Sequence, residues 1–221
     1  MNTPIILASK SPRRKEILQD LDFKIRVSHS NIDEIGDPRD LTLKERIISI
    51  ARRKAHDVSL QIDRELSQGI IIASDTVISF NGEILGKPQS RKEAFAMLTK
   101  LSGNSHSVIT ATVIIDNYKN QCYEVASETE VTFKELKKEC INKYLDQFDY
   151  LDKAGAYGIQ NDGDRLIKNI QGDYFNVMGL SVNKVLTYFK TYYDMNISMD
   201  NLVKKHEYLI RILQRDGDQD E

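Results

Sequence analysis

Apolar residues along the chain follow two spacings that alternate through the first half of the sequence. Nearly continuous apolar runs at residues 4–8 and 69–80, and the shorter segment 24–28, predict strands. Between them, apolar residues three and four positions apart predict a helix over residues 43–60, and a helix start at Ser11-Pro12 followed by Ile17-Leu18 predicts one over residues 12–20. Strands that alternate with helices in this way indicate an α/β fold.

Turn and cap residues mark the next elements. Asn81 and Gly82 form a strong hairpin signal that returns the third strand into a short partner strand. Ser90 followed by Glu93 is a capping-box pair, and it predicts a helix that begins directly after Ser90. Gly103 can adopt the positive φ at which many helices end, so this helix is expected to stop there.

The remainder of the chain is predicted to contain antiparallel strands and further helices. Residues 105–115 and 121–133 have the composition of two antiparallel strands joined by a short turn. Helices are expected over residues 134–145 and 177–193. No internal repeat or low-complexity linker interrupts the pattern, so residues 1–193 are expected to form a single domain.

Residues 194–221 are expected to form a helical extension with a frayed, acidic end. Its apolar residues lie three or four positions apart and make one seam of an amphipathic helix. We expect the seam to pack on the chain's own domain; a partner helix or a dimer contact is the alternative. The seam consists of Met199, Leu202, His206, Leu209 and Leu213.

Composition narrows the classes of function. The 221 residues are 40% hydrophobic and 29% charged, with a formal net charge of −2. A chain without a basic excess is not expected to bind nucleic acid generally, and its longest apolar stretch is too short to cross a bilayer. The first residues lack the features of a secretory signal, and two cysteines give no disulfide framework and no zinc spacing. We therefore expect a cytoplasmic protein.

Two arginines stand where a helix is expected to repel them. Ser11 and Pro12 predict a helix start, and Arg13 and Arg14 occupy its first turn, where the helix dipole disfavours cations. One interpretation is a solvated, slightly unfavourable helix start. The other is an anion site, in which N–H groups of the helix start, the Ser9 hydroxyl and both guanidinium groups surround a phosphate.

Asp75 lies inside the apolar run of the third strand. A carboxylate at such a position is costly unless it is paired, protonated or bound to a metal. It is therefore either half of a structural ion pair, or a general base or metal ligand. Thr76 follows directly, and a regular strand directs it to the opposite face of the sheet. Both residues can serve one pocket only where the strand bends or ends.

Several further positions carry candidate chemistry, each with an ordinary alternative as an exposed residue. Lys87 lies between a glycine and a proline, and Lys54 lies on a helix whose flanking alanines allow close packing. The acidic pair Asp33-Glu34 offers hard oxygen ligands to a divalent cation. Gln160 offers a paired donor and acceptor of the kind that recognises a base edge. Together these residues indicate a small phosphate ester or anhydride as the ligand.

Taken in order, these segments resemble the Maf family of nucleoside triphosphate pyrophosphatases. The resemblance covers about residues 4–190, and its S-P-R-R and A-G-A-Y-G-I-Q stretches are specific. The motifs are LASKSPRRKEIL at 7–18, IDE at 32–34, ARRKA at 51–55, ASDTV at 73–77, LGKP at 85–88, MLTKLSGNSHSVIT at 97–110, ETEVTF at 128–133, DKAGAYGIQ at 152–160 and GDYFNVMGL at 172–180.

The resemblance implies a fold and an activity. The fold would be an elongated mixed α/β sheet with flanking helices and two lobes around a central cleft, like that of inosine triphosphate pyrophosphatases. The activity would be hydrolysis of dTTP and UTP at the α–β anhydride, giving the monophosphate and pyrophosphate, with Mg²⁺ or Mn²⁺. Such an activity limits the incorporation of non-standard nucleotides. The resemblance also implies a homodimer.

The resemblance assigns roles to single residues as well. Asp75 matches the catalytic base, and Glu34 with Asp75 would hold the divalent metal. The residues that would bind the substrate phosphates are Ser9, Arg13, Arg14, Lys54 and Lys87. The trio that marks the subgroup acting on dTTP and UTP corresponds to Arg13, Thr76 and Gln160.

Two alternatives stay open. The first is the same reaction on a modified nucleotide, because a sister subgroup acts on 7-methyl-GTP. The second is a nucleotide-binding regulator of cell division that inhibits septum formation. The chain also departs from the family pattern: Lys10 replaces a small residue, GLSV at 179–182 replaces G-L-P-L, and the tail is longer than usual. Lys10 adds charge beside the predicted phosphate site, whereas the other departures concern the packing of the C-terminal region.

Overall fold

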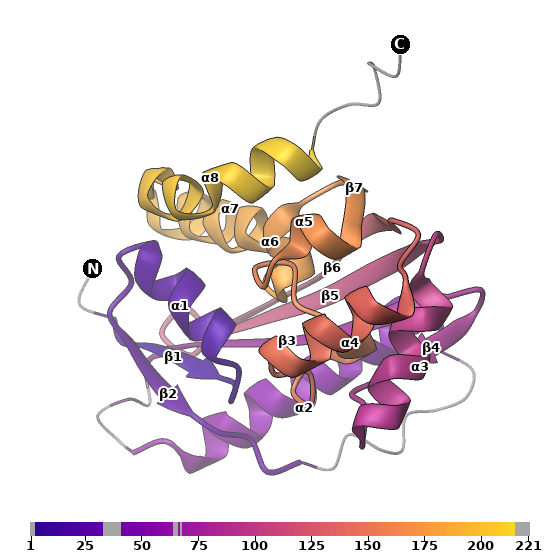
Figure 1. The fold of residues 1–221 in the computed structure, drawn as a ribbon. Coiled ribbons are helices and arrows are strands. Elements are labelled where there is room, and N and C mark those ends of the chain that lie inside the picture. Colours follow the sequence, from indigo (N-terminus) through magenta and orange to yellow (C-terminus); the bar gives the residue numbers. More distant parts are fainter. Residues whose placement is uncertain (1–2, 33–40, 64–65, 67, 215–221) are drawn as a thin grey trace. The chain divides into compact units, whose positions relative to one another are not determined.

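The computed structural model describes residues 3–32, 41–63, 66 and 68–214. Within these residues seven strands form one mixed sheet flanked by helices, which confirms the predicted α/β class (Figure 1). The strands are β1 (Ile5–Ala8), β2 (Ile25–Ser28), β3 (Ile70–Phe80), β4 (Glu83–Leu85), β5 (Ser105–Asp116), β6 (Gln121–Phe133) and β7 (Ile167–Gln171). They are hydrogen-bonded in the order β2-β1-β3-β5-β6-β7, and β4 pairs with β3.

Helices of very different lengths connect these strands. The longer ones are α1 (Pro12–Asp20), α2 (Leu43–Gln61), α3 (Arg91–Leu101), α4 (Lys138–Gln147), α7 (Val182–Tyr193) and α8 (Asp200–Leu213). The short ones are α5 (Gly163–Leu166), α6 (Tyr174–Met178) and a 3₁₀ turn at Ala154–Ala156. Most connections between them are short, as in other compact α/β folds.

Two compact units share these elements. Strands β3, β5 and β6 and helix α8 contribute residues to both. The elongated shape and the central cleft implied by the family resemblance stay predictions, as does the domain boundary at residue 193. Unit 1 comprises Met1–Thr76, Thr110–Ser127 and Gly179–Leu202, and unit 2 comprises Val77–Ile109, Glu128–Met178 and Val203–Glu221.

Unit 1 is built on parallel strands with helices on both faces. β1 pairs in parallel with β2 and with β3, so that Ile5 lies opposite both Ile25 and Ile70. The connections β1–α1–β2 and β2–α2–β3 run in opposite directions across the sheet, and right-handed crossovers therefore place α1 and α2 on opposite faces (Figure 1). Phe23, after α1, contacts Phe189 of α7 with ring centroids 4.8 Å apart, so α7 covers the same face as α1.

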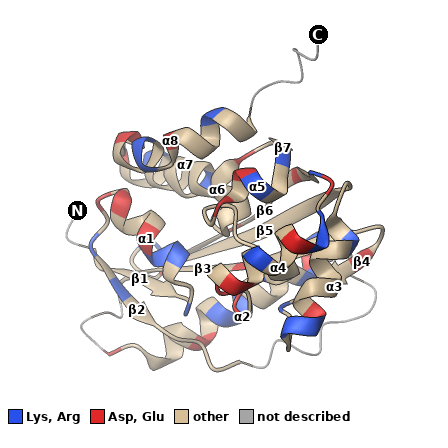
Figure 2. Ribbon diagram, viewed as in Figure 1, with Lys and Arg blue, Asp and Glu red and all other residues tan. Residues whose placement is uncertain are grey.

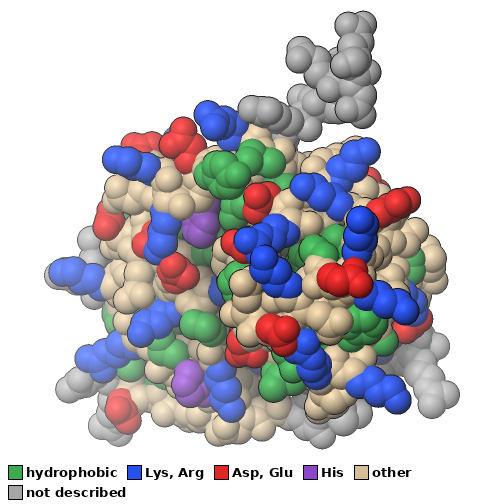
Figure 3. Space-filling model, in the orientation of Figure 1, with side chains coloured by type: hydrophobic (Ala, Val, Ile, Leu, Met, Phe, Trp, Pro, Cys, Tyr) green, Lys and Arg blue, Asp and Glu red, His purple; other side chains and the backbone are tan. Residues whose placement is uncertain are grey.

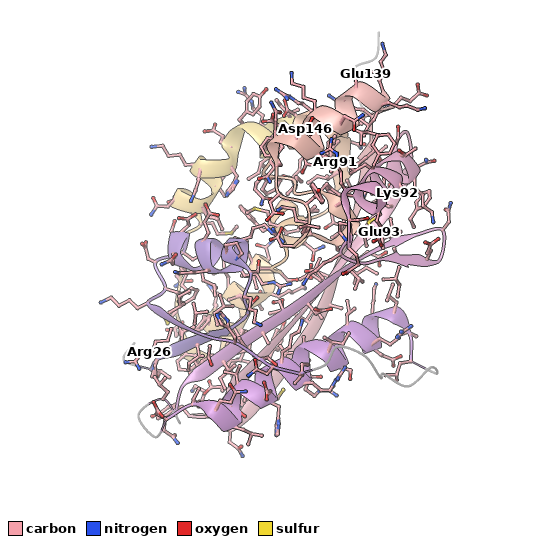
Figure 4. All side chains as sticks on the ribbon, turned by 60° about the horizontal axis from the view of Figure 1, so that its bottom comes forward. Arg26, Arg91, Lys92, Glu93, Glu139 and Asp146 are labelled. Atoms are coloured by element: carbon pink, nitrogen blue, oxygen red, sulfur yellow. The ribbon has the colours of Figure 1, made fainter. Side chains whose placement is uncertain are left out.

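Unit 2 combines antiparallel pairs with a helical layer. β4 returns along β3 after a turn in which Asn81 and Gly82 both have positive φ, 49° and 80°. This confirms the hairpin signal. α3 packs on α4, and Arg91 of α3 forms an ion pair with Asp146 of α4 at 2.8 Å (Figure 4). The ion pair is exposed, so it adds little to the packing of the two helices.

The hydrophobic pattern predicted the elements of the first half closely. β1, α1, β2, α2 and β3 each begin and end within one residue of the predicted bounds. α3 begins after Ser90, whose hydroxyl accepts from the Glu93 N–H at 3.2 Å. The Glu93 carboxylate accepts from the Gln89 N–H at 2.8 Å. Gly103 follows α3 with a φ of +72°, as predicted.

Two predicted helices differ from those in the structure. The helix expected over 134–145 begins only at Lys138. The reason is a contact with the segment after α3: the Lys134 carbonyl accepts from the Gly103 N–H at 3.0 Å and so does not accept the first hydrogen bond of a helix. The helix expected over 177–193 is divided into α6, which ends at Met178, and α7, which begins at Val182.

The amphipathic tail helix is α8, and its apolar seam packs on the chain itself. Leu202 and Leu213 are fully buried, and His206 is 8% exposed. The two remaining seam residues are half-buried. The His206 ring lies 5.4 Å from the ring of Tyr174 and 5.8 Å from that of Phe175, both on α6. The seam is therefore covered within the chain, which was the main interpretation of the sequence.

The described surface is mixed in charge. Basic and acidic side chains are interspersed over the face that Figure 3 shows. None of the described helices has the length and apolar character needed to cross a membrane. The chain carries a net charge of −2, so an anionic ligand must be bound by basic side chains that lie close together at its site.

His106 is a buried imidazole in unit 2. Its Nε2 atom lies 2.7 Å from the Tyr157 hydroxyl, and the Phe133 ring packs edge-on against it. Its Nδ1 atom is buried without a hydrogen-bond partner among the described residues. Burial lowers the pKa of His106 to about 4.

We expect His106 to make the folded protein less stable as the pH falls from about 6.5 to 4.5. In this range the unfolded chain binds a proton at this histidine and the folded protein does not, so the free energy of unfolding falls by about 2–3 kcal/mol. The variant His106→Gln loses this contribution. Urea denaturation of both proteins at pH 7 and pH 4.5 measures it, and an equal pH dependence of the two proteins would contradict the expectation.

Candidate functional site

The loop from β1 to α1 places several predicted site residues at one helix start. Ser11 occupies the N-cap position with extended φ and ψ of −69° and 118°, but its side chain makes no capping hydrogen bond. Its N–H donates instead to the Ser9 hydroxyl at 3.1 Å. Pro12 begins α1 as predicted, and the first turn contains basic residues and no acidic one (Figure 2). Arg13 lies there, half-buried.

The Arg14 guanidinium group joins three separate segments of unit 1. Its Nε donates to the Gly179 carbonyl at 2.7 Å, its Nη1 to the Ser9 hydroxyl at 3.1 Å, and its Nη2 to the Thr76 hydroxyl at 3.1 Å. One planar fork thus connects the β1–α1 loop, strand β3 and the turn before α7. We call Ser9, Arg14, Thr76 and Gly179 the Arg14 cluster.

Gly179 is the position in this cluster that only glycine fits. Its φ is +108°, a conformation that residues with a side chain rarely adopt. A Cβ atom there would lie 3.3 Å from the Thr76 hydroxyl and 3.5 Å from Arg14 Nε. The same conformation ends α6 and turns the Gly179 carbonyl toward Arg14, which is why the predicted helix over 177–193 is divided.

Asp75 is paired with a lysine on the other face of the sheet. Lys54 Nζ on α2 donates to Asp75 Oδ1 at 2.6 Å, and the two side chains are only 14% and 11% exposed. Ala51 and Ala55 are fully buried, so α2 packs closely enough for Lys54 to reach β3. Asp75 therefore faces α2, whereas Thr76 faces α1, as strand alternation predicted.

The structure brings five predicted site residues to two adjacent positions of β3. Arg14 joins Ser9 to Thr76, and Lys54 contacts Asp75. Asp75 is half of an ion pair, which was the first interpretation of its burial. Its role as a general base or metal ligand stays a prediction. Glu34, with Asp33, lies outside the described residues.

Lys87 and Gln160 belong to unit 2. Lys87 is exposed in the loop before α3. The carbonyl of Gly86 accepts from the Gly155 N–H at 3.0 Å, which fixes the backbone just before Lys87 against the segment that leads to Gln160. The placement of Lys87 thus agrees with the rigid loop that its neighbours predicted.

Gln160 has an oriented and unsatisfied acceptor. Its Oε1 atom is buried, and none of the described residues donates to it. The Gly158 N–H donates to the Tyr144 hydroxyl at 2.9 Å, and a Cβ at Gly158 would lie 3.0 Å from Lys153 Cε and 3.2 Å from Gln160 Oε1. Close packing therefore holds the side chain of Gln160, and its carbonyl oxygen lacks a donor among the described residues.

The described residues include no group of three or more His, Cys, Asp and Glu side chains that could hold a metal ion. At Asp75 the described donor set is one carboxylate, with Oδ1 engaged by Lys54. Mg²⁺ is commonly bound by one or two carboxylates together with the phosphates of a substrate. The residues present fit a cation that arrives with a nucleotide better than a cation held by the protein alone.

Sequence reasoning missed two members of this region, Thr110 and Gly179. Thr110 on β5 contacts the Thr76 hydroxyl at 2.9 Å. The signal that could have revealed it is the pair of threonines, at 110 and 112, inside an otherwise apolar strand. Buried hydroxyl groups need hydrogen-bond partners, so such a pair indicates polar contacts with a neighbouring strand.

Comparisons with known proteins give a consistent result. Residues 4–192 match the Maf family, described as "Maf-like protein". A relative from Fusobacterium nucleatum, named "dTTP/UTP pyrophosphatase", is 44% identical over 182 residues, which is 82% of this chain and 92% of that protein. A relative of the same name from Pyrococcus abyssi is 45% identical over 186 residues, 84% of this chain and 95% of that protein.

A solved structure of a HAM1 protein from Coxiella burnetii is similar to this chain over 58% of this chain and 73% of that chain, with a TM-score of 0.36 and 19% sequence identity. A similarity of this size carries no argument about the present fold or site. The α/β assignment therefore rests on the strands and helices described above.

We expect Gly179→Ala to lower the free energy of unfolding by about 2–3 kcal/mol, because the positive φ becomes strained and the new Cβ presses on the Thr76 hydroxyl. Gly86→Ala is the matched control, since its φ lies outside the left-handed region and a Cβ there meets no atom within 4 Å. Urea denaturation of the two variants checks this. Equal stability of the two variants would contradict the role given to Gly179.

Proposed function

Because the chain belongs to the Maf family, we propose that it is a nucleoside triphosphate pyrophosphatase that hydrolyses dTTP and UTP to the monophosphate and pyrophosphate. Relatives that match 82% and 84% of the chain carry the name dTTP/UTP pyrophosphatase. The observation that carries the proposal is the buried pair of Lys54 and Asp75, next to Thr76 on β3. Both positions lie beyond Ile72, the last residue of β3 that pairs with β1, so a ligand at the end of β1 can reach both faces of β3. A carboxylate and an ammonium group in this setting suit phosphoryl chemistry.

In the proposed reaction the bond between the α-phosphorus and the bridging oxygen breaks. A water oxygen attacks the α-phosphorus, Asp75 accepts the proton of that water, and pyrophosphate leaves with the bridging oxygen. Lys54 Nζ lies 2.6 Å from Asp75 Oδ1 and fixes the orientation of the carboxylate. Such a step depends on a positioned base and on charge neutralisation, not on a covalent intermediate.

The proposed phosphate ligands divide into two kinds. Arg13 lies on the first turn of α1, and Lys87 lies on an exposed loop before α3. Arg14 already donates to three protein acceptors, so it contributes its positive charge and holds Ser9 and Thr76 in place. The positive end of the helix dipole disfavours these cations in the free protein. A bound phosphate is attracted by both, so it removes the conflict.

A divalent cation, Mg²⁺ or Mn²⁺, belongs to this proposal, with Asp75 and Glu34 as its protein ligands. Bound with the nucleotide, such a cation neutralises phosphate charge and lowers the pKa of a coordinated water. Asp75 supplies one carboxylate from the described residues. The fit is that of a substrate-borne cation, because most of its ligands would be phosphate oxygens and water.

The proposed trio of Arg13, Thr76 and Gln160 selects the base. Uracil and thymine carry an N3–H donor between two carbonyl acceptors, whereas N3 of cytosine is an acceptor. The buried Oε1 of Gln160 has no donor among the described residues, so an imide N–H would satisfy it and a cytosine N3 would not. This complementarity favours dTTP and UTP over the cytosine nucleotides.

The tail helix does not favour the regulator alternative. His206 of its seam packs against α6 of the same chain, and Leu202 and Leu213 are fully buried, so the seam is not a free docking face. Hydrolysis of 7-methyl-GTP stays the enzymatic alternative. The cytoplasmic location and the homodimer stay expectations from the family.

The decisive experiment is a panel of triphosphates, dTTP, UTP, dCTP and 7-methyl-GTP, with and without added Mg²⁺ or Mn²⁺. We expect pyrophosphate release from dTTP and UTP only with metal, and a drop of at least about a hundredfold in turnover for Asp75→Asn, as for loss of a general base. Preference for 7-methyl-GTP would overturn the proposed specificity. Near-normal turnover of Asp75→Asn would overturn the assignment of the base.

Asp116→Asn is the matched control for this variant. Asp116 is a fully buried carboxylate in the same unit, and it accepts hydrogen bonds from the hydroxyl groups of Tyr188 and Tyr193. Its replacement disturbs a buried polar network in the way that Asp75→Asn does, but at a distance from the proposed chemistry. We expect it to lower the stability and to leave turnover within about threefold of the wild type.

A further inference from the structure

Two pairs of hydroxyl groups connect strands β3 and β5 inside unit 1. Ser74 Oγ lies 3.2 Å from Thr112 Oγ1, and two residues further along β3 Thr76 Oγ1 lies 2.9 Å from Thr110 Oγ1. Ser74, Thr110 and Thr112 are fully buried. Both pairs consist of two hydroxyl groups on the same two strands. They differ in that Thr76 also accepts a hydrogen bond from Arg14.

The hydrogen bonds of Thr76 leave little freedom to its hydroxyl group. A threonine hydroxyl has one hydrogen to donate and two lone pairs to accept with. Arg14 Nη2–H takes one lone pair at 3.1 Å. The contact with Thr110 takes either the second lone pair or the hydrogen. What Thr76 offers to a ligand therefore depends on which of the two threonines is the donor.

The direction of the Thr76–Thr110 hydrogen bond has two possible consequences. If Thr110 donates, both lone pairs of Thr76 are used and its O–H points to the ligand as a donor. If Thr76 donates, one of its lone pairs is left to accept from the ligand. A substrate group of the wrong kind would then leave a buried polar atom unpaired, which is the strongest route to discrimination between similar ligands.

Thr110 is well placed to fix this direction. It is fully buried on the central strand β5, and its carbonyl accepts from the Ser181 hydroxyl at 3.4 Å, just before α7. Its β-branched side chain has few rotamers in a strand. In the turn before α7, Gly179 is hydrogen-bonded to Arg14 and Ser181 to Thr110. This one turn therefore holds both residues that contact the Thr76 hydroxyl.

We propose that Thr110 is a positioning residue for substrate selection: its hydroxyl sets the direction of the Thr76 hydroxyl and thereby the preference of the site for dTTP and UTP. This inference rests on the proposed function. Thr110 does not touch the substrate in this account, and it acts through Thr76 alone. Nothing in the pattern of the sequence or in the names of the relatives assigns it this role.

The test compares three variants with the wild type. Thr110→Val removes the hydroxyl at nearly constant shape, Thr110→Ser restores it, and Thr112→Val removes the equivalent hydroxyl of the other pair. For each protein kcat and KM are measured with dTTP and with 7-methyl-GTP, and Tm is recorded. Thr110→Ala replaces the valine variant where valine prevents folding.

We expect Thr110→Val to lower the ratio of kcat/KM for dTTP to that for 7-methyl-GTP by about five- to tenfold, as for loss of one hydrogen bond that differs between the two substrates. Thr110→Ser should keep the ratio within about twofold of the wild type. Thr112→Val should change Tm but not the ratio, because its partner Ser74 is not a member of the Arg14 cluster. A merely structural role of Thr110 would lower both activities together.

An unchanged ratio for Thr110→Val, or an equal loss for Thr112→Val, overturns the inference while the proposed function stands. A loss of the ratio in Thr110→Ser also overturns it, since the hydroxyl is then not the cause. A wild type that releases no pyrophosphate, or that has no preference for dTTP, overturns the proposed function and the inference with it.

Discussion

The three hydrogen bonds of the Arg14 guanidinium hold the candidate site together. They reach the Ser9 hydroxyl after β1, the Thr76 hydroxyl on β3 and the Gly179 carbonyl before α7. Hydrogen bonds from a charged donor are among the stronger ones in proteins, and a planar fork fixes the mutual orientation of its acceptors. The loop that would surround a phosphate and the strand that carries the candidate base are therefore positioned by the same group.

Side chains on β3 alternate between the two faces of the sheet, and this places an ion pair and a hydroxyl group at adjacent positions. Asp75 faces α2 and is paired with Lys54, whereas Thr76 faces α1 and accepts from Arg14. A carboxylate and a hydroxyl at adjacent positions can therefore have independent partners. The cost of burying Asp75 is offset by the ammonium group at 2.6 Å, and removal of Lys54 would take this compensation from a buried carboxylate.

The strands and helices of the first half follow from the sequence because apolar runs, helix caps and turn residues are local signals. Contacts between distant segments are not visible in this way. The break between α6 and α7 lies at Gly179, and the apolar pattern shows neither its positive φ nor its hydrogen bond with Arg14, 165 residues away. The late start of α4 has a similar origin, in the hydrogen bond that the Lys134 carbonyl accepts from the Gly103 N–H.

The candidate site could be predicted in part. The unfavourable arginines and the buried Asp75 were visible as local conflicts, because each breaks a rule of helix or strand composition. The partner of Asp75 was not visible: Lys54 was expected to bind phosphate and not to pair with Asp75. Thr110 was predicted only as part of a strand. Residues whose role depends on a partner from another element carry little signal of their own.

The most direct test of the central role of Arg14 is the kcat/KM of Arg14→Lys for dTTP. Lysine keeps the positive charge but has a single ammonium group, which cannot satisfy acceptors on three segments at once. A fall of about tenfold or more is the result that the account predicts. A value within about twofold of the wild type would show that charge alone suffices, and it would contradict the account.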